Sequence, residues 1–361
     1  MTRFWLAVVL TLCVGQAALA QSSPKAAMLE QDGIAAIKAG QAQAAADLFR
    51  DAIALDPKNA RLYLGAGLAA YLQRRDADAK TALEQALALD PKLTVARAQL
   101  AQVLRRQQDF QGAINLYEVV AAEAPDDLGV RDTLERWKRE RDLHDSMQMT
   151  VRDHFTVSFE GPEDAGLASQ ALESLDRAFW RICEVFGAFP VRSIPVVLYT
   201  GQQFRDITRL PAWAVAAYDG TIRVPMLGAD QGEDLDRVLA HEFAHALIRT
   251  LATRNLPTWL NEGLASVLES DSLDWAEERL ADAAAVPSLA VLGGPFSKLD
   301  GHNAQVAYAA SALAARRLLD DAGGAAVANL LRDLGAGVDF ETAFLHRVQR
   351  SFADFQATLS Q

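Results

Sequence analysis

The sequence predicts two domains of different fold class: a stack of paired helices over residues 21–145 and an α+β domain over residues 148–361. Two observations predict this division. A repeat with a period of 34 residues runs through the first part. The second part begins with strand-like alternation and continues into a helix that carries two histidines four residues apart. We therefore expect the second domain to contain a small mixed sheet with an edge strand, a site-bearing helix and a helical C-terminal region.

Length and composition agree with a two-domain globular protein. The chain has 361 residues, of which 50% are hydrophobic and 23% are charged. The net charge of −12 disfavours nucleic acid and anionic membrane surfaces as partners. No stretch approaches the ~20 consecutive apolar residues of a membrane helix, so no stable membrane span is expected in the mature protein.

The N-terminus has the pattern of a signal peptide. Arg3 precedes a short apolar run over residues 4–14, and Ala18-Leu19-Ala20 forms a cleavage signature before Gln21. The pattern predicts that residues 1–20 are removed and that the protein is exported, to a periplasm or to the exterior. Cys183 is then the only remaining cysteine, so no intramolecular disulfide is expected.

Three units of the repeat cover about residues 26–59, 60–93 and 94–127, and a helix over residues 126–145 is expected to cap them. Small, large and proline positions recur with the same spacing: Ala45, Ala79 and Ala113; Phe49, Leu83 and Tyr117; Pro57, Pro91 and Pro125. Gly33, Gly67 and Ala101 occupy a further small position. This pattern resembles the tetratricopeptide (TPR) repeat, which implies a solenoid with a concave face that binds a protein partner. The alternative is that three repeats only brace the second domain.

The motif His241-Glu242-Phe243-Ala244-His245 lies at the centre of the second domain. Histidines four apart on a helix differ by about 40° in azimuth, so both imidazoles reach one metal ion. Glu262 follows on a second helix and is the expected third ligand. Two nitrogens and one carboxylate leave one tetrahedral position open, which is typical of catalytic zinc. Glu242 would then accept a proton from water at the metal.

The remaining elements of this domain follow from hydrophobic periodicity. Strands are expected at residues 155–159 and 194–199, and a short strand is expected after the Asp219-Gly220 turn. Helices are expected at residues 165–187, 202–208, 273–285 and 304–320.

The second domain resembles the gluzincin metallopeptidases, and in particular the peptidase MA-like branch. The resemblance is carried by the histidine motif and by three further segments, residues 218–225, 256–265 and 307–311. It implies that His241, His245 and Glu262 bind one Zn²⁺ and that Glu242 is the general base of peptide hydrolysis. It also implies that Tyr308 stabilises an oxyanion, and that Thr221, Ile222, Arg223 and Val224 form an edge strand that pairs with an extended peptide.

Several alternatives stay open at this point. His302 is a second candidate for the oxyanion donor. Ser266 stands where thermolysin-like enzymes carry an aspartate that steadies a histidine ligand. A non-catalytic TPR scaffold with a degenerate metallopeptidase domain is therefore an alternative, and an amidase acting on non-peptide amides is another.

Overall fold

The computed structural model describes residues 23–161, 164–208, 217–226, 232–252, 256–296 and 299–359. The signal peptide predicted over residues 1–20 lies outside them. The chain divides into two compact units between Leu143 and His144. No helix in the described ranges is both long enough and apolar enough to cross a membrane.

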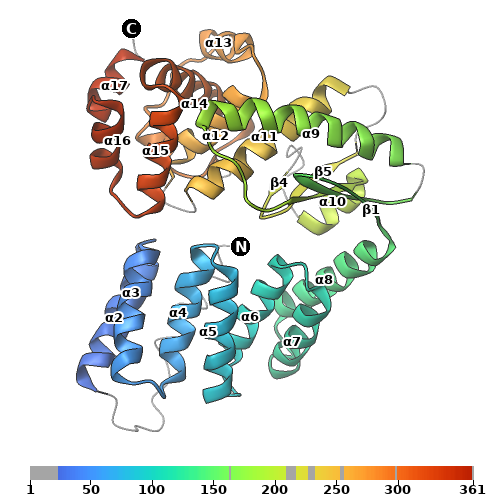
Figure 1. The fold of residues 1–361 in the computed structure, drawn as a ribbon, viewed down its shortest axis with the longest axis vertical. Helices are drawn as coiled ribbons and strands as arrows, with labels where there is room; N and C mark the ends of the chain where they lie inside the picture. The colour runs from blue at the N-terminus through green and yellow to red at the C-terminus, as the bar shows by residue number, and fades with distance from the viewer. Residues whose placement is uncertain are drawn as a thin grey trace. The chain divides into compact units, whose positions relative to one another are not determined.

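From residue 23 on, the first unit contains three helical hairpins followed by one more helix (Figure 1). The hairpins are α2 (Pro24–Lys38) with α3 (Ala42–Leu55), α4 (Ala60–Leu72) with α5 (Asp76–Leu89), and α6 (Thr94–Arg106) with α7 (Phe110–Glu123). The second helices begin at residues 42, 76 and 110, which keeps the 34-residue period of the sequence. The predicted solenoid of paired helices is therefore confirmed.

Small and large side chains alternate in the core of the hairpins as the repeat predicts. Ala45, Ala79 and Ala113 are fully buried, and the large side chains at the next equivalent position, Phe49, Leu83 and Tyr117, are buried beside them. A Cβ atom at Gly67 would lie 2.7 Å from Leu83 Cγ, so glycine allows α4 and α5 to approach closely. Helix contact at this distance explains why the position is small in all three units.

Helix α8 (Leu128–Ser146) covers the end of the stack. Within its charged segment, residues 136–142, Trp137 and Glu140 are buried. Trp137 packs on Tyr117 with ring centroids 4.5 Å apart. The Glu140 carboxylate accepts hydrogen bonds from the Arg105 guanidinium at 3.0 and 3.4 Å, which satisfies both carboxylate oxygens. Part of the charged segment is therefore an internal contact of the cap.

The second unit contains a five-stranded mixed sheet in the order β1-β2-β3-β5-β4. The strands are β1 (Gln148–Arg152), β2 (Phe155–Phe159), β3 (Ile194–Tyr199), β4 (Ala217–Tyr218) and β5 (Ile222–Pro225). β2, β3 and β5 are parallel, with Val157 opposite Val196 and Val196 opposite Ile222. β1 and β4 are the two edges, and each pairs antiparallel with its neighbour.

The two faces of this sheet have different partners because side chains alternate along each strand. Helices α9 (Ala165–Phe186) and α11 (Gly232–Leu251) pack on one face, and the side chains that meet them are Phe155, Val157, Phe159, Ile194, Val196, Leu198, Ile222 and Val224. Helix α10 (Gly201–Thr208) packs against β3 and β5, and Val197, Tyr199 and Arg223 belong to the face away from the main core.

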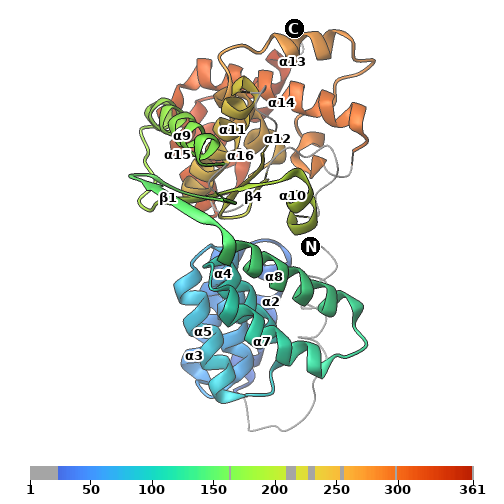
Figure 2. The same ribbon diagram turned by 90° about the vertical axis from the view of Figure 1, so that its right-hand side faces the viewer.

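Six further helices follow: α12 (Thr258–Glu269), α13 (Asp274–Ala281), α14 (Gly301–Ala322), α15 (Gly324–Gly335), α16 (Phe340–Val348) and α17 (Phe352–Thr358), with a 3₁₀ turn η2 (Val291–Gly293) before α14. α12 packs against both α11 and α14, and Figure 2 shows these three helices together. A Cβ atom at Gly263 would overlap the backbone oxygen of Ser311. Glycine at this position therefore sets how closely α12 and α14 approach.

Candidate metal centre

The structure brings the three predicted ligand residues together. His241 and His245 lie one turn apart on α11, and Glu262 lies in the second turn of the adjacent α12. Their ligand atoms lie within 4.8 Å of one another. His241 Nε2 is 3.1 Å from His245 Nε2, and Glu262 Oε2 is 3.8 Å from the first of these nitrogens and 3.5 Å from the second.

These distances fit a single tetrahedral zinc ion. Ligand bonds of about 2.0–2.1 Å with tetrahedral angles place neighbouring ligand atoms roughly 3.4 Å apart. The three observed separations lie on both sides of that value. Asn261 Nδ2 donates a 3.1 Å hydrogen bond to Glu262 Oε1, which leaves Oε2 directed at the histidines. Two nitrogens and one oxygen are a donor set that suits zinc.

Glu269 orients the first histidine, and the sequence reasoning missed it. His241 Nδ1 lies 2.5 Å from Glu269 Oε2, so a proton on Nδ1 is donated to this carboxylate and Nε2 is left for the metal. Arg237, one turn before His241 on α11, donates a 2.9 Å hydrogen bond to Glu269 Oε1. Ser266, one turn after Glu262, carries no carboxylate. Glu269 supplies it from seven positions after Glu262, two turns along the same face of α12.

The charges of the cluster perturb its titration. Burial by itself would lower the pKa of His241, but its hydrogen bonds to Glu262 and Glu269 raise that pKa to about 10. Burial would raise the pKa of Glu262, but the charges and hydrogen bonds of the two histidines hold it well below its usual range. Near neutral pH, without a metal ion, the His241 imidazole therefore carries protons on both ring nitrogens. A metal ion that binds Nε2 has to displace the proton on that nitrogen.

Glu242 is placed differently from the ligands. Its side chain is only 6% exposed, and its Oε2 atom has no hydrogen-bond partner among the described residues. Burial raises the pKa of Glu242, although the positive charges of His245 and His241 oppose this effect. A buried carboxylate oxygen without a partner is costly in a folded protein. An acceptor left free beside the ligand cluster is suited to taking a proton from a bound molecule.

Of the two candidate oxyanion donors, Tyr308 has the better position. Burial, followed by the negative charges of Glu262 and Glu242, raises the pKa of Tyr308, so its phenol is near the site and stays protonated. Its ring packs edge-on against Phe296, with centroids 5.2 Å apart. His302 lies in the exposed first turn of α14, where its charge acts on Asp300. A protonated phenol can donate a hydrogen bond, so the oxyanion role of Tyr308 stays a prediction.

The prediction of a free edge strand is wrong for Ile222 and Arg223. β5 pairs with β3 on one side, and on the other side Ile222 and Arg223 pair with Tyr218 and Ala217 of β4. Thr221, Ile222, Arg223 and Val224 are all buried. Arg223 donates a hydrogen bond to the Tyr199 hydroxyl and another to Asp219 Oδ1, on the sheet face away from α11. Ile222 and Arg223 are therefore paired on both sides within the described sheet and do not form a free edge.

Replacing Glu269 by glutamine is expected to weaken zinc binding by about 10–100-fold, because the charge that favours the Nδ1–H tautomer of His241 is lost. Competition with a chromogenic zinc chelator measures this affinity. Glu278→Gln, at an exposed position of α13, is the matched control and should bind zinc as the wild type does. Unchanged affinity in Glu269→Gln would show that Glu269 serves only as a partner of Arg237.

Comparison with known proteins finds one matching family model. Residues 175–351 match the model of the Peptidase MA superfamily. A solved structure described as the first TPR of Spaghetti (RPAP3) bound to the HSP90 peptide SRMEEVD is similar to the helical repeats, with 23% identity over 34% of this chain and 98% of that chain, at a TM-score of 0.32. No curated protein matches the chain. The matched segment includes α11, α12 and the whole ligand cluster. The second unit therefore carries a domain of the Peptidase MA superfamily.

Proposed function

We propose that this chain is an exported zinc metallopeptidase that hydrolyses peptide bonds. The observation that carries the proposal is the convergence of His241, His245 and Glu262 within 4.8 Å, beside a buried Glu242 whose Oε2 has no partner among the described residues. A purely structural metal site has no use for a free carboxylate next to its ligands. Membership of a peptidase superfamily supports the same reaction class.

Each side chain has a distinct role in this proposal. Zinc, when bound by the three ligands, supplies an acidified water and a Lewis acid for the scissile carbonyl. Glu242 accepts the proton of the attacking water and returns it to the leaving amine. Tyr308 donates a hydrogen bond to the oxyanion. Glu269 keeps His241 in the tautomer that presents Nε2.

Export and partner binding complete the proposal. Export is supported by the signal-peptide pattern of residues 1–20. Binding of a protein partner or substrate to the repeats is supported by the stack of three hairpins, because such solenoids generally present an extended concave surface.

The metal content of the purified protein tests the site directly. The chain from Gln21, purified without chelator, is expected to contain about one zinc per molecule by mass spectrometry of metals. His245→Ala removes one of three ligands and is expected to lose the metal, whereas His346→Ala, far along the chain in α16, should retain it. Full zinc in His245→Ala would show that the site is misassigned. Absence of zinc from wild-type protein, even after its addition, would favour a scaffold with a degenerate peptidase domain.

A further inference from the structure

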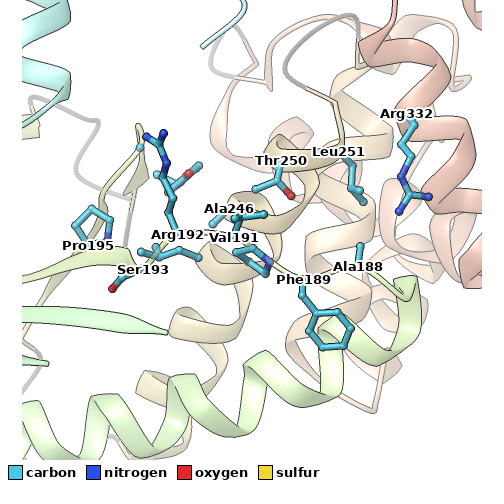
Figure 3. Close-up of a pocket in the computed structure, with 14 residues that line it drawn as sticks. Ala188, Phe189, Val191, Arg192, Ser193, Pro195, Ala246, Thr250, Leu251 and Arg332 are labelled. Carbon is cyan, nitrogen blue, oxygen red and sulfur yellow. The ribbon is translucent and has the colours of Figure 1, made fainter. Parts of the chain in front are cut away.

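A hollow lies beside the C-terminal half of α11, on a different side of this helix from the metal ligands. It has a volume of about 550 Å³ and lies between residues 188–195, the β4–β5 turn, α11 and α15 (Figure 3). Ala246 and Thr250 of α11 form part of its wall. Ala246 directly follows the ligand His245, but none of His241, His245 and Glu262 lines this hollow. We call it the Val191 groove.

The wall formed by residues 188–193 is held at both ends. Gly187, with φ 57°, ends α9 in a left-handed conformation, and Ala188 N–H then donates to the Cys183 carbonyl at 3.2 Å. At the other end, Ile194 N–H donates to the His154 carbonyl at 2.9 Å. A wall anchored in this way is formed before any ligand arrives, which lowers the entropy cost of binding.

The same wall exposes apolar side chains. Val191 is 100% exposed and Phe189 is 53% exposed. Phe189 is supported from behind by Phe179 and Trp180, with ring centroids 6.0 and 6.2 Å away. Trp180 is itself 60% exposed, so the apolar surface extends beyond the groove. Clustered exposed apolar groups of this kind mark interaction surfaces.

The groove is positively charged in a protein that carries a net charge of −12. Its lining contains Arg192 and Arg332 and no aspartate or glutamate among the described residues. Figure 3 shows the two arginines at opposite ends, with Val191, Ala246 and Thr250 between them. Arg192 forms no hydrogen bond or ion pair with a described residue, and Arg332 donates to the side chain of Asn329. The two guanidinium groups thus remain available for carboxylates.

We propose that the Val191 groove binds an acidic peptide segment in which an apolar stretch lies between two carboxylate side chains. The apolar stretch would pack on Val191 and Phe189, and the carboxylates would pair with Arg192 and Arg332. Arginine suits this role because its planar guanidinium forms paired hydrogen bonds with a carboxylate. This site is separate from the metal centre and its occupancy does not depend on hydrolysis.

The test is peptide binding to full-length mature protein carrying Glu242→Gln, which prevents turnover. The probe is a fluorescent acetyl-Gly-Asp-Leu-Phe-Glu-Gly-amide, followed by anisotropy. We expect saturable binding that weakens with salt and persists after EDTA, since the site needs no metal. Arg192→Gln and Arg332→Gln should each weaken binding by about tenfold, and Val191→Ser should weaken it without changing the salt dependence.

Matched controls decide between this groove and general charge attraction. Arg181→Gln removes an exposed arginine of α9 that does not line the groove, and Val286→Ser removes an exposed valine elsewhere in the second unit. Neither should affect binding. Equal weakening by Arg181→Gln, equal binding of the Asn/Gln version of the peptide, or no binding at all would each overturn the proposal. Binding to phosphatidylglycerol vesicles that is lost in Val191→Ser, without peptide binding, would show instead that the surface contacts lipid.

Discussion

Glu242→Gln is expected to keep the metal and to lose hydrolysis, with kcat/KM falling by about 10²–10⁴-fold or more. Glutamine has nearly the same size as glutamate, and Glu242 is not one of the converging ligands, so the zinc content should equal that of the wild type. Turnover of a fluorogenic peptide mixture measures the effect. Glu277→Gln, exposed on α13, is the control and should be fully active.

The unfolding temperature of the same variant is a second measurement, and it separates a catalytic role of Glu242 from a structural one. Burial raises the pKa of Glu242, which means that the folded state disfavours its ionised form. A neutral glutamine removes this penalty at neutral pH. Metal-free Glu242→Gln should therefore unfold at the same temperature as wild type or at a higher one. Turnover equal to that of wild type would exclude Glu242 as the general base, and a large loss of stability would show that it acts mainly in packing.

Gly263→Ala is expected to have the largest structural effect. Its Cβ would overlap the Ser311 backbone oxygen, and this oxygen cannot move away without shifting α14. Overpacking of this kind typically costs about 1–3 kcal/mol. Since Gly263 directly follows Glu262, displacement of α12 should also weaken zinc binding.

Chemical denaturation and metal content together measure these two effects. Gly166→Ala, in the first turn of α9, is the matched control, because its added Cβ meets no atom within 4 Å and its backbone is not left-handed. It is expected to be neutral or slightly stabilising. Equal stability of Gly263→Ala and Gly166→Ala would show that α12 and α14 can separate without cost.

The sequence predicts well those features that depend on residues close together along the chain. His241 and His245 converge because any helix places residues four apart on one side. The hairpins follow from a spacing repeated three times, and α3, α5 and α7 begin at residues 42, 76 and 110 as that spacing requires. The helix predicted at residues 165–187 is observed at Ala165–Phe186, where its apolar stripe meets the sheet.

The errors concern contacts between segments distant in the sequence. β4 contains only Ala217 and Tyr218, too short to give a strand pattern, yet it pairs with Ile222 and Arg223 of β5, which were expected at a free edge. β1 was not predicted, although Met149 and Val151 alternate with polar residues; both side chains are exposed and add nothing to the core. Glu269 was missed because the resemblance to thermolysin-like enzymes predicts the orienting carboxylate at Ser266, one turn after Glu262. Its role depends on the side-by-side packing of α11 and α12, which one-dimensional spacing does not reveal.

The parallel pairing of β2, β3 and β5 has a consequence for how the protein folds. These strands join residues separated by whole helices, such as Val157 with Val196, so loops must close before the sheet gains any stability. The helices of the first unit contact mainly their neighbours in the sequence. We therefore expect the repeats to form on a faster timescale during synthesis or refolding. The zinc ligands, which need both α11 and α12 in place, would assemble late.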